Sequence, residues 1–309
     1  MPENGESLVV AVASGDRRAL ARLITLIEED HPGAGEALRT VFAAATPAHR
    51  VGITGAPGAG KSTLTDGLIR LIRSGGERVA VLAVDPTSPF SGGAVLGDRV
   101  RMQDHVLDQG VFIRSMATRG HLGGLSAAAP KALLALEAAR YPWILVETVG
   151  VGQDEVEVTA TADTIVVVVT PGWGDGIQAA KAGILEIGDV FVVNKADRPG
   201  GADTVADLRA MLALAARADW VPPILETVAS SGGGVAALWE AVSAHRSHLG
   251  TAGLADRRRR RRATDLETAL AVALRLRARS LIAEHHDLAA AVERGEVDPW
   301  TVAERLARS

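Results

Sequence analysis

Cysteine is absent from the 309-residue chain. Without a thiol, the protein can form no disulfide and offers neither a thiolate metal ligand nor a cysteine nucleophile. This composition is compatible with a reducing compartment but does not establish one.

Long apolar runs and a strong excess of one charge are also missing. The longest apolar runs, such as residues 165–169, are far too short to cross a bilayer. A formal net charge of −4 gives no general attraction to nucleic acid or to membranes. The first residues carry Glu3 and Glu6 and lack the basic and apolar pattern of a signal or transit peptide. We therefore expect a cytoplasmic globular protein that binds neither nucleic acid nor membrane.

The clearest motif that is present is a phosphate-binding loop, because residues 55–62 read G-x-x-x-x-G-K-S between an apolar run and a helical pattern. Its glycines allow backbone N–H groups to wrap the α- and β-phosphates of a nucleotide. Lys61 is expected to reach the β- and γ-phosphates and to act in catalysis, while the Ser62 hydroxyl coordinates Mg²⁺. The nucleotide-binding residues predicted here are Gly55, Ala56, Pro57, Gly58, Ala59, Gly60, Lys61, Ser62 and Thr63.

The pattern around this loop predicts an α/β fold of the P-loop NTPase type. Short apolar runs alternate with helical segments through residues 47–250, which predicts a mostly parallel sheet covered by helices on both faces. Residues 1–46 are expected to form an N-terminal helical extension, and residues 251–309 a C-terminal helical arm. Ligands of such sheets bind at the carboxyl ends of the strands.

The base of the nucleotide is predicted from residues 194–197, which read N-K-A-D and match the guanine-reading motif N-K-x-D of GTPases. The Asp197 carboxylate can accept hydrogen bonds from both N1–H and the 2-amino group of guanine, whereas adenine has no such donor pair. Asn194 and Lys195 complete the motif, and Ala229 begins a loop expected to contact the base through its backbone. GTP is therefore favoured over ATP.

Three carboxylates follow predicted strands or loops near the same edge. Glu147 opens the stretch E-T-V-G, which stands where other GTPases carry D-x-x-G, and there the N–H of Gly150 would meet the γ-phosphate. Asp85 and Asp98 are the other two acids, each of which taken alone could be a turn or cap residue. With Ser62 they form the predicted Mg²⁺ site.

The sequence gives only a weak candidate for the residue that orients the catalytic water. No glutamine directly follows Gly150, and Gln153 is near but displaced. We therefore expect slow intrinsic GTP hydrolysis that a partner accelerates.

Four motifs together resemble the methylmalonyl-CoA mutase-associated GTPases, the MeaB/ArgK family. They are V-D-P-T-S at residues 84–88, G-D-R-V-R-M at 97–102, E-T-V-G-V-G-Q at 147–153 and N-K-A-D at 194–197. The resemblance implies a homodimeric GTPase of the class that includes signal-recognition and nickel-insertion GTPases. It also implies a chaperone that gates cofactor loading of an adenosylcobalamin-dependent acyl-CoA mutase and protects that enzyme. The matching motifs imply phosphate or Mg²⁺ contacts for Lys61, Ser62, Asp85, Asp98 and Glu147.

Residues 171–181 resemble the mobile switch of that family, in which Asp175, Gln178 and Lys181 would relay the nucleotide state to the partner. An arginine run at 257–262 could be a nucleic-acid contact, but it lacks interleaved aromatic residues, so a solvated helix face is favoured. An apolar stripe on the following helical segment predicts a homodimer, through Leu266, Leu270, Ala273, Leu274, Leu281 and Ile282.

Other functions remain open from the sequence. A kinase acting on a small molecule or transport protein would also use the phosphate loop, although N-K-x-D argues against ATP as the donor. A nickel metallochaperone GTPase would need cysteine or clustered histidine before the loop, and neither is present. A binding module with a structural nucleotide is excluded only by measuring turnover.

Overall fold

The computed structural model describes residues 5–31, 33–85, 103–105, 107–117, 128–148, 161–172, 185–214 and 219–308. The chain forms two compact units, Met1–Arg258 and Arg259–Ser309. In the described part of the chain, no helix combines the length and hydropathy that a membrane span requires.

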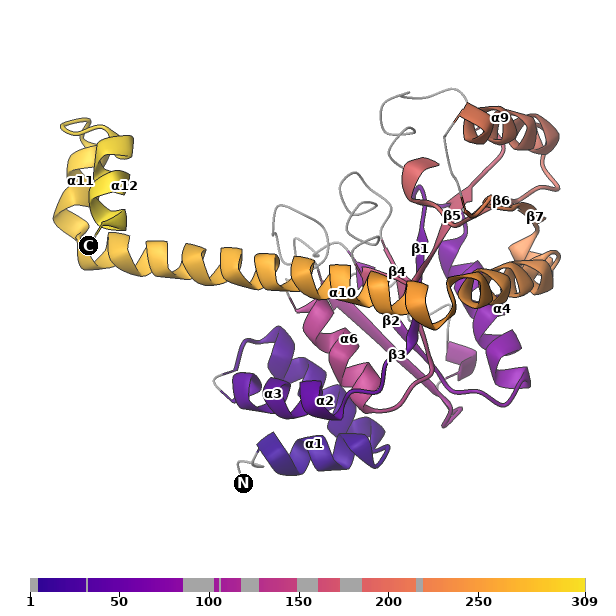
Figure 1. Ribbon diagram of the computed structural model, residues 1–309, viewed down its shortest axis with the longest axis horizontal. Helices are drawn as coiled ribbons and strands as arrows, with labels where there is room; N and C mark the ends of the chain where they lie inside the picture. Colours follow the sequence, from indigo (N-terminus) through magenta and orange to yellow (C-terminus); the bar gives the residue numbers. More distant parts are fainter. Residues whose placement is uncertain are drawn as a thin grey trace. The chain divides into compact units, whose positions relative to one another are not determined.

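The first unit is built on one sheet of seven strands, in the order β3-β2-β4-β1-β5-β6-β7 (Figure 1). Every neighbouring pair of these strands is parallel. Parallel pairing brings the carboxyl ends of all seven strands to one edge, which confirms the predicted fold class. The strands are β1 (His49–Thr54), β2 (Val79–Asp85), β3 (Val111–Ala117), β4 (Trp143–Glu147), β5 (Thr164–Val169), β6 (Val190–Asn194) and β7 (Ile224–Thr227).

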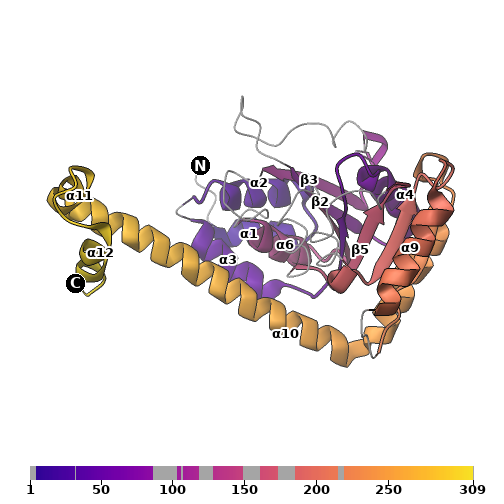
Figure 2. The same cartoon turned by 90° about the horizontal axis from the view of Figure 1, so that it is seen from above.

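Helices bury both faces of this sheet, as the apolar and non-alternating strands require. In β4, Ile144 and Val146 join a core with α1, α2, α3, α6 and α9, while Trp143 and Leu145 join a second core with α4 and the first part of α10. Figure 2 shows α1, α2, α3 and α6 gathered together beside the sheet. These helices are α1 (Gly5–Ala13), α2 (Arg17–Glu28), α3 (Ala34–Ala44), α4 (Lys61–Ser74), α6 (Ala129–Ala138), α9 (Gly201–Leu214) and α10 (Val235–Glu284).

Local sequence sets several helix ends. The Asp16 side chain accepts hydrogen bonds from the backbone N–H groups of Arg18 and Ala19 and so caps α2. Gly250, with φ 54° and ψ −165°, interrupts the helical conformation of α10. In the second unit, Asp298 caps α12 (Pro299–Ala307), which packs against α11 (His286–Glu293).

Large apolar side chains lie exposed on the part of α10 that belongs to the second unit. Their exposed fractions range from 50% to 70%. They are Leu266, Leu270, Leu274, Leu276 and Ile282.

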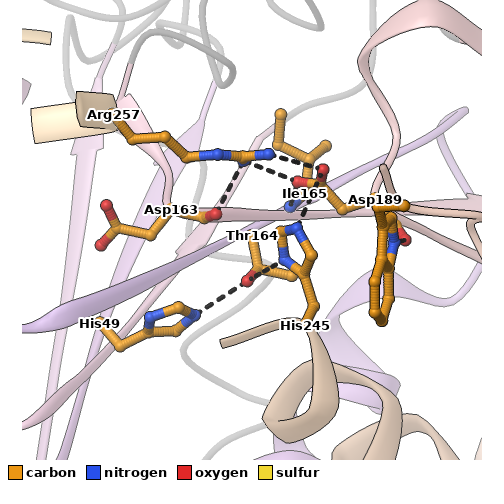
Figure 3. Close-up of polar contacts among 8 residues, drawn as sticks. His49, Asp163, Thr164, Ile165, Asp189, His245 and Arg257 are labelled. Atoms are coloured by element: carbon orange, nitrogen blue, oxygen red, sulfur yellow. Dashed lines mark hydrogen bonds and ion pairs between the residues drawn. The ribbon is translucent and has the colours of Figure 1, made fainter. Parts of the chain in front are cut away.

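A buried polar cluster, drawn in Figure 3, lies at the amino ends of β1, β5 and β6. The Thr164 hydroxyl lies 2.8 Å from His49 Nε2 and 2.8 Å from His245 Nδ1 on α10. Asp189, directly before β6, accepts two hydrogen bonds of 2.9 Å from the Arg257 guanidinium and another of 2.9 Å from the Ile165 N–H. The cluster therefore ties three strands to α10 at the edge opposite to their carboxyl ends.

This cluster corrects the expectation that the whole arginine run is a solvated helix face. Arg257 also donates to the Asp163 carbonyl oxygen at 2.8 Å, and Arg258 donates to the Ala48 carbonyl oxygen at 3.2 Å. Buried carboxylates and carbonyls need donors, and the first two arginines of the run supply them.

Burial sets the charge of both histidines in the cluster. Desolvation lowers the pKa of His49 and that of His245 from 6.5 to about 4 in each case, although Asp163 and Asp189 partly oppose the shift. Both rings are therefore neutral at pH 7 in the folded protein. An unfolded chain would take up protons on them below about pH 6.5.

The stability of the fold should therefore fall with acidification. Because the folded pKa values lie below the unfolded ones, stability is fully present above about pH 6.5 and is lost as the pH falls toward 4. Between these limits each histidine should steepen the slope of unfolding free energy by up to about 1.4 kcal/mol per pH unit. Urea unfolding between pH 7.5 and 4.5 measures that slope.

A His245→Gln variant is the control, because glutamine does not titrate and carboxylates elsewhere also contribute to acid unfolding. We expect a shallower slope for the variant, whatever its stability at pH 7.5. Equal slopes for both proteins would contradict the assignment of a lowered pKa to His245.

Candidate functional site

The phosphate loop lies at the carboxyl edge of the sheet, between the end of β1 at Thr54 and the start of α4 at Lys61. Gly55, Gly58 and Gly60 have φ values of 138°, 75° and 97°, which favour glycine. A Cβ on Gly55 would lie 2.0 Å from the Val168 carbonyl oxygen of β5. The backbone of the loop thus packs directly on the neighbouring strand.

Positive groups converge on this loop. Lys61 is buried, and its Nζ donates to the carbonyl oxygens of Gly55 at 2.8 Å and Ala56 at 3.2 Å. The N-cap residue of α4 is Gly60, which has no side chain that could cap the helix. Backbone N–H groups in the first turn of a helix lack partners within the helix, so this turn is suited to an anion.

Glu147 faces α4 from the end of β4, where it is almost fully buried. Its Oε1 accepts a hydrogen bond of 2.5 Å from the Ser62 hydroxyl, and its Oε2 accepts one of 3.1 Å from the Thr65 hydroxyl. In the sheet register, Glu147 pairs with Ile53, one residue before the end of β1. Two of the four residues predicted to hold a metal, Ser62 and Glu147, are therefore in direct contact.

The base-reading motif is tied to the same loop from the other side. Asn194 Nδ2 donates to the Ala59 carbonyl oxygen at 2.7 Å, and Lys195 Nζ donates to the Gly58 carbonyl oxygen at 2.6 Å. The Asn194 amide oxygen accepts from the Thr227 hydroxyl at 3.0 Å and from the Ala229 N–H at 3.1 Å. The residues predicted to read the base therefore brace the residues predicted to hold the phosphates.

The remaining predicted residues divide into two groups. Asp197 is exposed beyond the end of β6, and Asp85 is the last residue of β2. The others lie outside the described residues, namely Asp98, Gly150, Gln153, Asp175, Gln178 and Lys181.

The described residues contain a part of the predicted metal site. Among the described residues, which leave out Asp98, no group of three His, Asp or Glu side chains could hold a metal ion. Ser62 and Glu147 supply a hydroxyl and a carboxylate, and oxygen ligands of this kind suit Mg²⁺.

Two threonine side chains at the carboxyl edge of the sheet contact the predicted site but belong to none of the sequence motifs. Thr65 stands three residues after Ser62, so the two share one face of α4, and this spacing is the signal that could have found it. Thr227 ends β7 and pairs with Asn194 in the sheet register, which only a correct strand order would reveal.

Comparison with known proteins places these features in context. The family model described as methylmalonyl-CoA mutase-associated GTPase MeaB matches residues 20–283. A Pyrococcus horikoshii protein that is named as a GTPase is 48% identical over 97% of this chain and 96% of its own length. The GTPase ArgK of Escherichia coli is 38% identical over 77% of this chain and 75% of its own length.

A solved structure is similar over the whole chain. The crystal structure titled LAO/AO transport system kinase covers 100% of this chain and 98% of its own, with a TM-score of 0.72 and 27% sequence identity.

Proposed function

Since the chain belongs to the MeaB family of GTPases, we propose that it couples GTP hydrolysis to the assembly and protection of an adenosylcobalamin-dependent acyl-CoA mutase. The enzymatic part, a GTPase, follows from the family and its relatives. The proposed client is a mutase of the methylmalonyl-CoA type, because the family name associates its members with that enzyme. The chaperone role, which gates cofactor loading, is the step that goes beyond these findings.

The observation that carries the nucleotide chemistry is the pair of side-chain ties on the phosphate loop. Glu147 contacts Ser62 on one side of the loop, and Asn194 contacts the Ala59 carbonyl on the other. Phosphate-binding, metal-binding and base-binding candidates are thus parts of one braced unit. A preorganised unit of this kind stabilises developing charge without reorganising during the reaction.

The residues predicted to bind the nucleotide and the metal have distinct tasks in this proposal. Lys61 and the N–H groups of the loop bind the phosphates of GTP and stabilise charge as water attacks the γ-phosphate in line. Ser62 and Glu147, together with Asp85 and Asp98, would hold Mg²⁺, whose positive charge helps to neutralise the phosphates. Asp197 would accept the hydrogen bonds of guanine.

Regulation is proposed to depend on the segment around residues 171–181 and on slow intrinsic hydrolysis. No glutamine directly follows Gly150 to orient the water, and Gln153 stands three residues beyond that glycine. A partner that completes the site would then raise the rate. Asp175, Gln178 and Lys181 are proposed to carry the nucleotide state to the mutase.

The exposed leucines on α10 support a homodimer. Leu266, Leu270 and Leu274 follow each other at intervals of four residues, so they lie along one side of the helix. A row of exposed apolar side chains of this size is typical of a protein interface.

Disruption of that row should favour the monomer. We expect Leu270→Glu to shift a dimer to monomer in sedimentation velocity, because a buried interface would then contain an unpaired carboxylate. Leu276→Glu, which changes an equally exposed leucine outside the four-residue row, is the matched control. A wild-type protein that is monomeric at tens of micromolar would contradict the proposed dimer.

A kinase is the second candidate, because the similar solved structure carries a kinase title. Such an enzyme would transfer the γ-phosphate to an acceptor other than water. Its product would be a phosphorylated molecule in place of inorganic phosphate.

Release of inorganic phosphate from GTP, with and without an adenosylcobalamin-dependent acyl-CoA mutase from the same organism, tests the proposal. We expect slow release by the protein alone and at least about tenfold faster release with the mutase, because a partner can supply a group that positions the water or stabilises the transition-state charge. Lys61→Ala is the control and should abolish both rates, since it removes the ammonium from the phosphate loop.

Slow release that no such mutase changes would remove the chaperone role and leave the GTPase. Wild-type rates in Lys61→Ala would show that the phosphate is released elsewhere.

A further inference from the structure

Thr65 is a fully buried residue of α4 that no nucleotide motif includes, yet it contacts the carboxylate at the centre of the site. Its hydroxyl lies 3.1 Å from Glu147 Oε2, and its neighbour on the same helix face, Ser62, lies 2.5 Å from Glu147 Oε1. The two hydroxyls therefore hold one oxygen each. We propose that Thr65 is a positioning residue that orients the Glu147 carboxylate for Mg²⁺ and thereby for GTP hydrolysis.

The need for a second contact follows from the torsion of the glutamate. Rotation about the last side-chain bond of Glu is soft, so a single hydrogen bond to Oε1 leaves the plane of the carboxylate poorly defined. A hydrogen bond to Oε2 fixes that plane. Oε1 then remains directed at the Ser62 hydroxyl, the oxygen expected to contact the metal.

Thr65 is itself held in place by its helix. Its hydroxyl also lies 3.0 Å from the Lys61 carbonyl oxygen, one turn back along α4. The hydroxyl has one proton and two acceptors within reach, of which the carboxylate is the one that can carry a full charge. Hydrogen bonds to charged acceptors are the stronger ones, so donation to Glu147 is favoured.

The same contact links the metal site to the phosphate loop. Lys61, Ser62 and Thr65 lie within the first five residues of α4, and the helix begins where the loop ends. Ser62 and Thr65 therefore hold Glu147 from the first turns of α4, directly after the phosphate loop. Partners of metal ligands commonly change metal affinity by 10- to 100-fold when they are removed.

The inference rests on the proposed Mg²⁺ site, and the test separates the two. GDP affinity is measured by calorimetry in EDTA and again in excess Mg²⁺, and the ratio of the two affinities reports the contribution of the metal. For Thr65→Val, which keeps the shape but removes the hydroxyl, we expect this ratio to fall about tenfold while affinity in EDTA stays near that of the wild type. Thr65→Ser, which keeps the hydroxyl, should restore the ratio.

Thr204→Val is the matched control away from the site. The Thr204 hydroxyl is also on a buried threonine and makes a 3.0 Å bond to the carbonyl of Gly200, four residues earlier, but it has no carboxylate partner among the described residues. Its ratio should equal that of the wild type. Thermal unfolding of each variant shows whether it is folded before the titration.

Each outcome decides a separate point. A wild-type ratio in Thr65→Val, or a failure of Thr65→Ser to restore it, would overturn the role of Thr65. If Mg²⁺ does not raise the affinity of the wild type itself, the proposed metal site fails. If Thr65→Val does not fold, Thr65→Ala in the same titration replaces it and must show the same tenfold loss.

Discussion

The contact between the Glu147 carboxylate and the first turns of α4 is the interaction on which the site depends. β4 lies beside β1, and their register places Glu147 next to the point where the phosphate loop begins. A carboxylate at this depth must be hydrogen-bonded, and the helix supplies the hydroxyls of Ser62 and Thr65. The same pairing therefore satisfies a buried carboxylate and joins the end of β4 to the first turns of α4.

Close packing extends this constraint to the base-reading motif. Gly60 leaves no room for a side chain, because an added Cβ would lie 2.2 Å from Asn194 Nδ2. Asn194 in turn is held by β7 through Thr227. Two residues of the N-K-A-D motif, Asn194 and Lys195, are therefore tied directly to the backbone of the phosphate loop.

The parts of this site that the sequence predicts are those encoded by consecutive residues. The residue types within the loop at 55–62 and the motif at 194–197 are enough to predict what each would bind. The uninterrupted apolar strands likewise predict a sheet buried on both faces. Contacts between distant residues are different. Thr65 meets Glu147 across 82 residues, and Arg257 meets Asp189 across 68. No periodic pattern encodes such pairs, so Arg257 reads as a surface residue until the strand order is known.

The central claim is that this edge of the sheet is a guanine-nucleotide site, and calorimetric titration with GDP and ADP in Mg²⁺ tests it most directly. The account predicts one GDP bound per chain and an affinity for ADP at least about 100-fold weaker, since adenine lacks the donors that the Asp197 carboxylate would accept. Equal affinities for the two nucleotides, or no binding of GDP, would contradict it.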